Sequence, residues 1–108
     1  MTITEVTITI PSHPRTAQLR AHADICIDRC FRVRGFRVVE VEPAKFAVYM
    51  PSTLRDGQFE DVAYPSTREA REMVERAILE AHASAMRDGV VHAVYRRGDP
   101  AGTPRIAV

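Results

Sequence analysis

No stretch of the 108-residue sequence is apolar over the roughly 18 residues that a membrane span needs. The first six residues also lack the basic segment and the apolar segment of a secretion signal. Both absences predict a cytoplasmic protein that does not insert into a membrane. With 45% apolar and 27% charged residues, the chain has the usual composition of a folded protein, and its length allows only one domain.

Cysteine is nearly absent. Cys26 and Cys30 are the only two, and neither belongs to a CxxC pair or lies beside two histidines. In one extended strand their Cα atoms would lie far beyond the limit of about 7 Å for a disulfide, although a turn at Asp28-Arg29 would bring them closer. The cytosol keeps thiols reduced. We therefore expect neither a disulfide nor a metal site, and a fold that depends on neither cysteine.

The sequence also lacks the short motifs that mark catalytic centres. It has no glycine-rich phosphate loop, no HExxH or GxSxG motif and no cluster of carboxylates. Asp24 and Asp28 would lie roughly 13 Å apart along one strand, so we interpret them as solvated acids. Four histidines are isolated from one another in sequence: His13, His22, His82 and His92. We expect a non-enzymatic protein with no catalytic residue, no cofactor and no bound metal.

Neither sign of charge is in clear excess. Fifteen basic residues, all arginine except Lys45, face fourteen acidic residues, and the net charge is +1. Such a chain has no strong long-range field to attract nucleic acid or an anionic membrane. Any site for a polyanion must therefore be a local patch. Arginine suits phosphate recognition, but coding composition alone also accounts for this bias.

What the sequence does contain is a pattern of strands. Residues 2–10 alternate in their second half between apolar and polar side chains, which is the period of a half-buried strand. Residues 19–28 alternate over ten positions and predict a long antiparallel strand with one wet face. The apolar parity of the next segment switches after Gly35, so we expect a bulge or turn there.

A hairpin is predicted in the middle of the chain. Phe46, Val48 and Met50 alternate as a strand. Asp56-Gly57 is a turn signal that would connect this strand to a second one beginning near Phe59.

A helix is predicted to follow Pro65. Ser66 and Glu69 form a capping-box pattern at its start, and Gly89 fits its C-terminus. An apolar stripe recurs at three- and four-residue spacing and should lie against a sheet: Ala70, Met73, Val74, Ala77, Ile78, Ala81 and Ala85. Residues 90–95 have strand propensity, whereas residues 96–108 are rich in turn residues and are expected to be mobile.

These elements predict an α+β fold, a twisted antiparallel sheet of four to five strands with one C-terminal helix packed on it. The central block that contains them has a specific order of residues: Met50-Pro51-Ser52, Asp56-Gly57, Phe59, Asp61-Val62-Ala63 and Pro65, then Ala77-Ile78-Leu79 in the helix. Further positions upstream follow the same pattern: Arg20-Ala21, Ala23, Ile25, Ile27-Asp28, Phe31, Val33 and Arg37-Val38-Val39. Over residues 3–82 the chain resembles the SpoVG family (stage V sporulation protein G, septation protein).

The resemblance implies what the protein does. It implies a SpoVG-like domain at residues 1–88. The resemblance leaves the tail unmatched, and the residue pattern predicts a C-terminal extension at residues 89–108 with a short strand and a mobile tail. The resemblance also implies a small cytoplasmic regulatory protein linked to sporulation, septation and cell division. Such a protein would bind DNA or RNA as a homodimer. Composition and spacing alone do not indicate that role.

Five arginines are the candidate nucleic-acid contacts: Arg55 in the hairpin connection, Arg68 and Arg71 in the first helical turns, and Arg32 and Arg34 on one strand face. Helix N-terminal amides would help the two helical arginines hold a phosphate. The alternative is a solvated surface with local ion pairs. Tyr49 and Tyr64 would form a base-stacking platform only if exposed beside cations, and structural packing is the favoured interpretation.

The comparison with the family pattern also predicts weak binding. In that pattern the connection after Met-Pro-Ser carries a Lys-Arg pair, whereas Arg55 is the one cation of Thr53-Leu54-Arg55. Arg71 corresponds to an arginine of the family, but Met73 stands where lysine is common. A second hypothesis follows: a scaffold of the same fold that binds protein partners and has lost most nucleic-acid binding.

Overall fold

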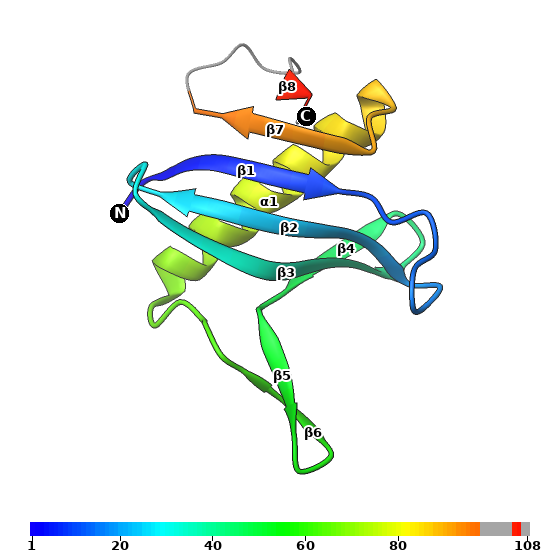
Figure 1. Cartoon of the computed structure of the whole chain (residues 1–108), viewed down its shortest axis with the longest axis vertical. Coiled ribbons are helices and arrows are strands. Elements are labelled where there is room, and N and C mark those ends of the chain that lie inside the picture. The colour runs from blue at the N-terminus through cyan, green and yellow to red at the C-terminus, as the bar shows by residue number, and fades with distance from the viewer. Residues whose placement is uncertain (98–104, 107–108) are drawn as a thin grey trace.

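The computed structural model describes residues 1–97, 105 and 106, and shows one antiparallel sheet, one helix and a separate hairpin (Figure 1). In chain order the elements are β1 (Ile3–Thr9), β2 (Leu19–Ile27), β3 (Phe31–Glu42), β4 (Lys45–Tyr49), β5 (Ser52–Arg55), β6 (Gln58–Asp61), α1 (Arg68–Asp88), β7 (His92–Arg96) and β8 (Arg105–Ile106). The strand order of the main sheet is β4-β3-β2-β1-β7-β8. The expected α+β class is confirmed, with β8 adding two residues beyond the five longer strands.

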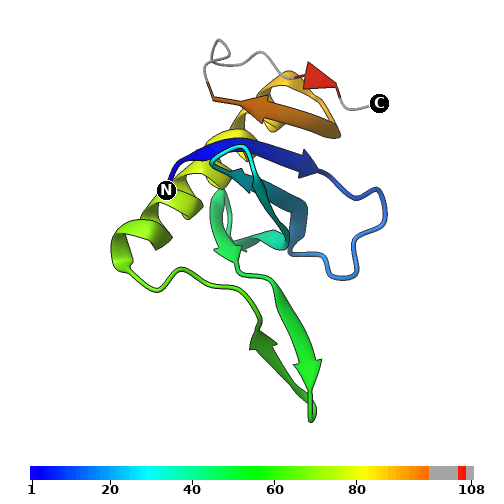
Figure 2. The same cartoon turned by 60° about the vertical axis from the view of Figure 1, so that its left-hand side comes forward.

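The first four strands form an antiparallel meander. Alternate side chains of β2 turn toward α1 and are buried, among them Ala21, Ala23 and Ile25. The intervening side chains, such as His22, lie on the opposite face, which the helix leaves uncovered in both views (Figures 1 and 2). The long strand with one wet face is therefore confirmed.

The predicted irregularity at Gly35 is a β-bulge inside β3. The pairing register of β2 with β3 shifts between Ala23, which faces Phe36, and Ile25, which faces Val33. Gly35 has φ +96°, which L side chains rarely adopt. Because of this bulge, Val33 before Gly35 and Phe36 and Val38 after it all pack into the core, whereas Phe31 is 64% exposed.

The helix begins one residue later than the capping pattern predicted. Thr67 is the N-cap, and its hydroxyl accepts a hydrogen bond from the Ala70 backbone N–H at 3.1 Å. The predicted Ser66/Glu69 capping box was therefore wrong. With Thr67 as the N-cap, the third helical position is Ala70, and its methyl group cannot accept a hydrogen bond from the N-cap backbone N–H. The C-terminus was predicted correctly, since Gly89 adopts the left-handed conformation with φ +69°.

One stripe of α1 packs on the sheet. Its buried residues are Val74, Ile78, Ala81, His82 and Ala85. Met73 was assigned to this stripe wrongly, because 41% of its surface is exposed. In the part of the chain that the structure describes, no helix is both long enough and apolar enough to cross a membrane.

The strand expected at residues 90–95 forms as β7, which pairs antiparallel with β1. The division of the chain at residue 88 stays a prediction, although β7 shares the sheet with the preceding strands. The mobile tail was expected at residues 96–108, but Arg96 ends β7 and Arg105–Ile106 form β8, which pairs with β7. The rest of that expectation concerns mainly residues 98–104, 107 and 108, which lie outside the described part of the chain.

The central hairpin differs from the prediction. Asp56-Gly57 does form a turn, but it joins β5 to β6 rather than β4 to the strand at Phe59. These two strands form a separate sheet that projects from the body (Figure 2). We call residues 52–61 the arm. None of its side chains is buried, so it contributes nothing to the core.

Candidate functional site

A hollow lies where the base of the arm meets the sheet and the helix. Its volume is about 460 Å³, and it is lined by Arg37, Val48, Tyr49, Met50, Ser52, Phe59, Asp61 and Arg71. We call it the arginine hollow. Apart from Met50, which lies between β4 and β5, its residues come from β3, β4, β5, β6 and α1, so the hollow depends on how the base of the arm meets the sheet and the helix.

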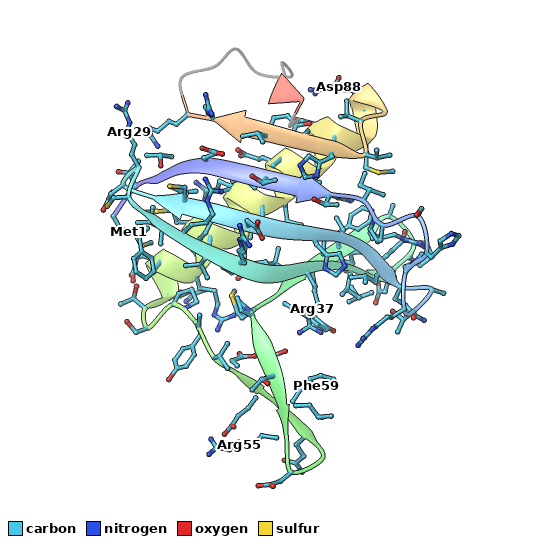
Figure 3. The ribbon with its side chains drawn as sticks, viewed as in Figure 1. Met1, Arg29, Arg37, Arg55, Phe59 and Asp88 are labelled. Atoms are coloured by element: carbon cyan, nitrogen blue, oxygen red, sulfur yellow. The ribbon has the colours of Figure 1, made fainter. Side chains whose placement is uncertain are left out.

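Arg37 is held in one orientation at this hollow (Figure 3). Its Nη2 group donates to the Ser52 hydroxyl at 2.9 Å and to the Met50 carbonyl at 3.5 Å. The guanidinium carbon also lies 5.6 Å from the ring centre of Tyr49, its neighbour across the strand pair. Among the described residues Arg37 makes no ion pair. A half-buried guanidinium without a carboxylate keeps its full charge available to an anion.

Arg71 supplies the second cation of the hollow. Its backbone N–H bonds to the Thr67 carbonyl, so the residue sits in the first turn of α1, where the helix dipole also favours anions. Its side chain is exposed and makes no ion pair with any residue in 1–97. This is the one predicted contact that the structure brings to the hollow.

The other predicted arginines lie elsewhere, and each pairs with an acid. Arg55 is 3.6 Å from Glu60, and Arg68 is 3.2 Å from Glu72. On the uncovered sheet face, the separations are 3.4 Å for Arg32–Glu5 and 3.8 Å for Arg34–Asp24. The five arginines therefore do not form one patch, and for these four the local ion pairs of the alternative interpretation are present.

Sequence reasoning missed Arg37 as a site residue. It was noted only as part of the strand pattern, because nothing in the local sequence shows that the arm brings Ser52 next to it. The cue that the sequence did contain is Tyr49, an aromatic on the neighbouring strand.

The packing interpretation of the two tyrosines was wrong. Tyr49 is 45% exposed and Tyr64 is 65% exposed. Phe59, which lines the arginine hollow from the arm, is 73% exposed. Two aromatic rings thus border the hollow together with two arginines, which is the combination used by proteins that stack nucleic-acid bases.

The remaining polar candidates have structural partners. Asp28 accepts a bond from the Thr2 backbone N–H at 2.8 Å, and Asp24 pairs with Arg34, so neither is simply solvated.

Cys26 is buried and Cys30 is exposed, and both thiols are free. Within residues 1–97, 105 and 106, no three histidine, cysteine or acidic side chains gather as metal ligands.

A second hollow lies at the outer edge of the sheet. It has a volume of about 470 Å³ and is lined by Ala44, Lys45, Phe46, Leu79, His82, Ala83 and Met86. We call it the edge hollow. His82 packs edge-on against Phe46 with ring centres 4.9 Å apart, and its Nε2 atom has no partner in the described structure. Burial lowers the pKa of His82, which favours the neutral ring.

Fold and site together define a small α+β domain that presents a hollow of arginines and aromatic rings beside a projecting arm. The chain belongs to the SpoVG family, whose family model, described as SpoVG, matches residues 1–84. The family suggested by residues 3–82 is therefore confirmed, and the matched region ends within α1.

Several relatives carry the name "Putative septation protein SpoVG". The protein of Bdellovibrio bacteriovorus is 41% identical over 83 residues, which cover 76% of this chain and 73% of the relative. That of Anaeromyxobacter sp. (strain Fw109-5) is 35% identical over 89 residues, 82% and 89% of the two chains. That of Archaeoglobus fulgidus is 42% identical over 65 residues, 59% and 75% of the two chains.

Proposed function

We propose that the protein is a cytoplasmic, non-enzymatic regulator of septation that binds DNA or RNA through the arginine hollow as a homodimer. The septation role rests on the names of the relatives. The observation that supports nucleic-acid binding is the pair Arg37 and Arg71, two guanidinium groups that line one hollow and have no ion pair among the described residues. Both charges are available to phosphate oxygens.

The proposed site revises the five-arginine patch. Arg71 stays in it, and Arg37 joins it. Arg55 and Arg68 lie outside the hollow, and their charges are partly offset by Glu60 and Glu72. Exposed ion pairs of this kind are worth at most about 1 kcal/mol, so a phosphate can displace them. Affinity is therefore weak and falls with salt, by roughly 0.9 in log K per log salt for each phosphate contacted on duplex DNA.

The test compares two arginines of the same helix. Arg71→Ala should weaken binding of labelled DNA and RNA oligonucleotides by about fivefold to tenfold and lower the salt slope by about one. Arg76→Ala removes the same charge from an exposed position outside the hollow and serves as the matched control, with an expected change below about twofold. Equal losses in both variants would mean that binding follows net charge and not this site.

The dimer is proposed at the free edge of β4. In the described chain β4 pairs only with β3, and unpaired sheet edges of soluble proteins are normally covered or paired. The edge hollow extends this edge with apolar side chains, including Met86, which is 58% exposed. A second copy that pairs β4 with β4 would cover both features. It would also place the two arginine hollows on one continuous sheet.

Light scattering tests this arrangement with two methionines of α1. Met86→Lys puts a charge into the edge hollow and should convert the dimer to the 12.1 kDa monomer. Met73→Lys is the control, because Met73 is also exposed but lies outside that hollow. A native protein that is a stable 12.1 kDa species at micromolar concentration would refute the dimer.

A second candidate function is a protein-interaction scaffold. It is favoured by apolar side chains on and beside the arm, where Leu54 is 62% exposed and Val62 is 63% exposed. Exposed apolar residues that gather on a surface often mark protein-binding sites. Failure of the native protein to bind any oligonucleotide at low salt would favour this function over nucleic-acid binding.

A further inference from the structure

We infer that the arginine hollow selects single-stranded nucleic acid, by seating an unpaired base against Tyr49 or Phe59 while Arg37 and Arg71 contact the adjoining phosphates. This inference rests on the proposed function and adds the class of nucleic acid. It is carried by the placement of aromatic rings and unpaired arginines around one hollow.

The aromatic rings are the first argument. A duplex presents phosphates and base edges, but its base faces are stacked inside the helix. An aromatic side chain gains stacking energy only from a base whose face is accessible, which means a base in a single strand, a loop or a bulge. Phe59 is 73% exposed and has no core to pack into, so its ring is free to stack.

The second argument is the size of the site. Its volume of about 460 Å³ lies within the range of roughly 300–1,000 Å³ that is usual for small-molecule sites. A hollow of this size admits a base with its sugar and phosphate. A duplex keeps its base faces stacked inside, so it would meet the hollow only with its backbone or its groove edges.

The donors of Arg37 are the third argument. A guanidinium has five N–H donors, and both Nη2 bonds of Arg37 go to protein oxygens, on Ser52 and Met50. The donors on Nε and Nη1 remain for a ligand. Because Ser52 fixes the plane of the group, little rotamer entropy is lost when a phosphate binds.

The arm determines which of its side chains lie at the hollow. Figure 3 shows Phe59 on the same side of the arm as Arg37, with Arg55 on the other side. Leu54 pairs directly with Phe59 across the hairpin, so the two side chains share one face of the arm, yet Leu54 does not line the hollow. The arm therefore offers an aromatic residue inside the site and an apolar residue outside it, which makes a matched pair for mutation.

The experiment measures binding of labelled oligonucleotides of about 12 nucleotides, as oligo(dT), oligo(rU) and a DNA duplex, at one low salt concentration. The native protein should bind the single strands at least about fivefold more tightly than the duplex. Phe59→Leu should lower single-strand affinity by about fivefold to tenfold and duplex affinity by less than about twofold, since it removes the ring and keeps the bulk.

Two variants serve as controls. Phe59→Tyr should keep single-strand binding, and Leu54→Ala should leave the affinities for single strands and for duplex unchanged. The oligo(dT) and oligo(rU) results distinguish DNA from RNA as the source of the strand.

A spectroscopic signal gives a direct reading of stacking. An oligo(dT) strand with one 2-aminopurine should lose fluorescence on binding the native protein, because stacking on an aromatic ring quenches this base. Phe59→Leu should reduce that quenching at saturating protein, while Leu54→Ala should leave it intact.

The possible failures are distinct. If Phe59→Leu changes neither substrate while Arg71→Ala weakens both, base seating is wrong and the proposed function stands. If the native protein binds no oligonucleotide at low salt, the proposed function itself fails. If polyglutamate displaces the oligonucleotide as effectively as unlabelled strand does, the hollow takes an acidic peptide and the inference is overturned. A Phe59→Leu protein that becomes monomeric in light scattering would overturn it also, because the ring would then serve assembly.

Discussion

Arg37 donates to the hydroxyl of Ser52 across 2.9 Å, and this bond links the third strand of the sheet to the first strand of the arm. It also fixes the guanidinium at the rim of the arginine hollow. Ser52 is half-buried, and the guanidinium also lies over the Tyr49 ring. The orientation of a binding group thus depends on a residue that need not touch the ligand.

We predict that Ser52→Ala weakens oligonucleotide binding by about twofold to fivefold while lowering the free energy of unfolding by only about 0.5–1.5 kcal/mol. The variant frees Arg37 to adopt other rotamers, so part of the binding energy is lost in ordering it. Thr53→Ala, at the exposed neighbouring position, is the control. Binding titrations and urea unfolding check both parts, and an unchanged affinity in Ser52→Ala would show that Arg37 needs no positioning.

A second prediction concerns Asp61, the one acidic residue among the described residues that line the arginine hollow. Its carboxylate repels an incoming phosphate, so Asp61→Asn should tighten binding by about twofold to fivefold at low salt. The gain should shrink as salt rises. Asp88→Asn, at the opposite end of the molecule in Figure 3, removes the same charge and should have almost no effect. Weaker binding in Asp61→Asn would mean that the carboxylate contacts the ligand favourably.

The third prediction tests which residue caps the helix. Thr67→Ala removes the hydroxyl that accepts from the Ala70 N–H and should lower the free energy of unfolding by about 1 kcal/mol. Ser66→Ala should change it by less than about 0.5 kcal/mol, because Ser66 is exposed and not the cap. Thermal or urea unfolding of the two variants measures both changes. A larger loss of stability in Ser66→Ala than in Thr67→Ala would mean that Ser66 caps the helix after all.

The fourth prediction concerns the bulge in β3. Gly35→Ala should destabilise the protein by about 1–3 kcal/mol, because a residue with a Cβ is strained at φ +96°. Crowding adds little, since the new Cβ would lie 3.4 Å from the Pro51 Cβ, an ordinary contact. Gly57→Asn is the control: it also has positive φ, but it lies in the arm, which holds no buried side chain. Chemical unfolding should show a much smaller change for Gly57→Asn.

The fifth prediction is a pH effect from His82. Burial lowers the pKa of His82 below its value in the unfolded chain, so the unfolded chain binds the proton more readily. The stability that neutral His82 contributes is therefore fully present above the unfolded pKa of about 6.5, and it is lost as the pH falls through the lower, folded pKa. His82→Phe keeps the edge-on contact with Phe46 and removes the titration. It should flatten the loss of stability between about pH 7.5 and pH 5.5.

The control for this prediction is His13→Ala, which changes an exposed histidine outside the core. Its unfolding free energy should depend on pH as that of the native protein does. If His82→Phe keeps the native pH dependence, another group is responsible for it.

Much of the body could be predicted from the sequence, because its strands have one buried face. The alternation of β2 and the switch of parity at Gly35 both reflect burial against α1, and both were confirmed. The arm could not be predicted in the same way. Its strands bury neither face, so no period of two marks them, and residues 52–55 were assigned to the hairpin connection instead of to a strand.

The site was harder to predict, because it is a tertiary arrangement. Arg71 was identified from its place at the start of a helix, which is a local feature. Arg37 was not, since its role depends on the arm bringing Ser52 and Phe59 beside β3 and β4. The error at the N-cap has a different origin. Ser66 and Thr67 both carry a capping hydroxyl, and only the backbone path after Pro65 decides between them.

The exposed arm has a consequence for how the protein can change. Because residues 52–61 hold no buried side chain, substitutions there leave the core packing intact. The arm nevertheless supplies three of the residues that line the arginine hollow: Ser52, Phe59 and Asp61. Selection can therefore alter what the hollow binds while folding stays the same. An arm from another member of the family, transplanted between Pro51 and Val62, should carry its own binding preference onto this unchanged body.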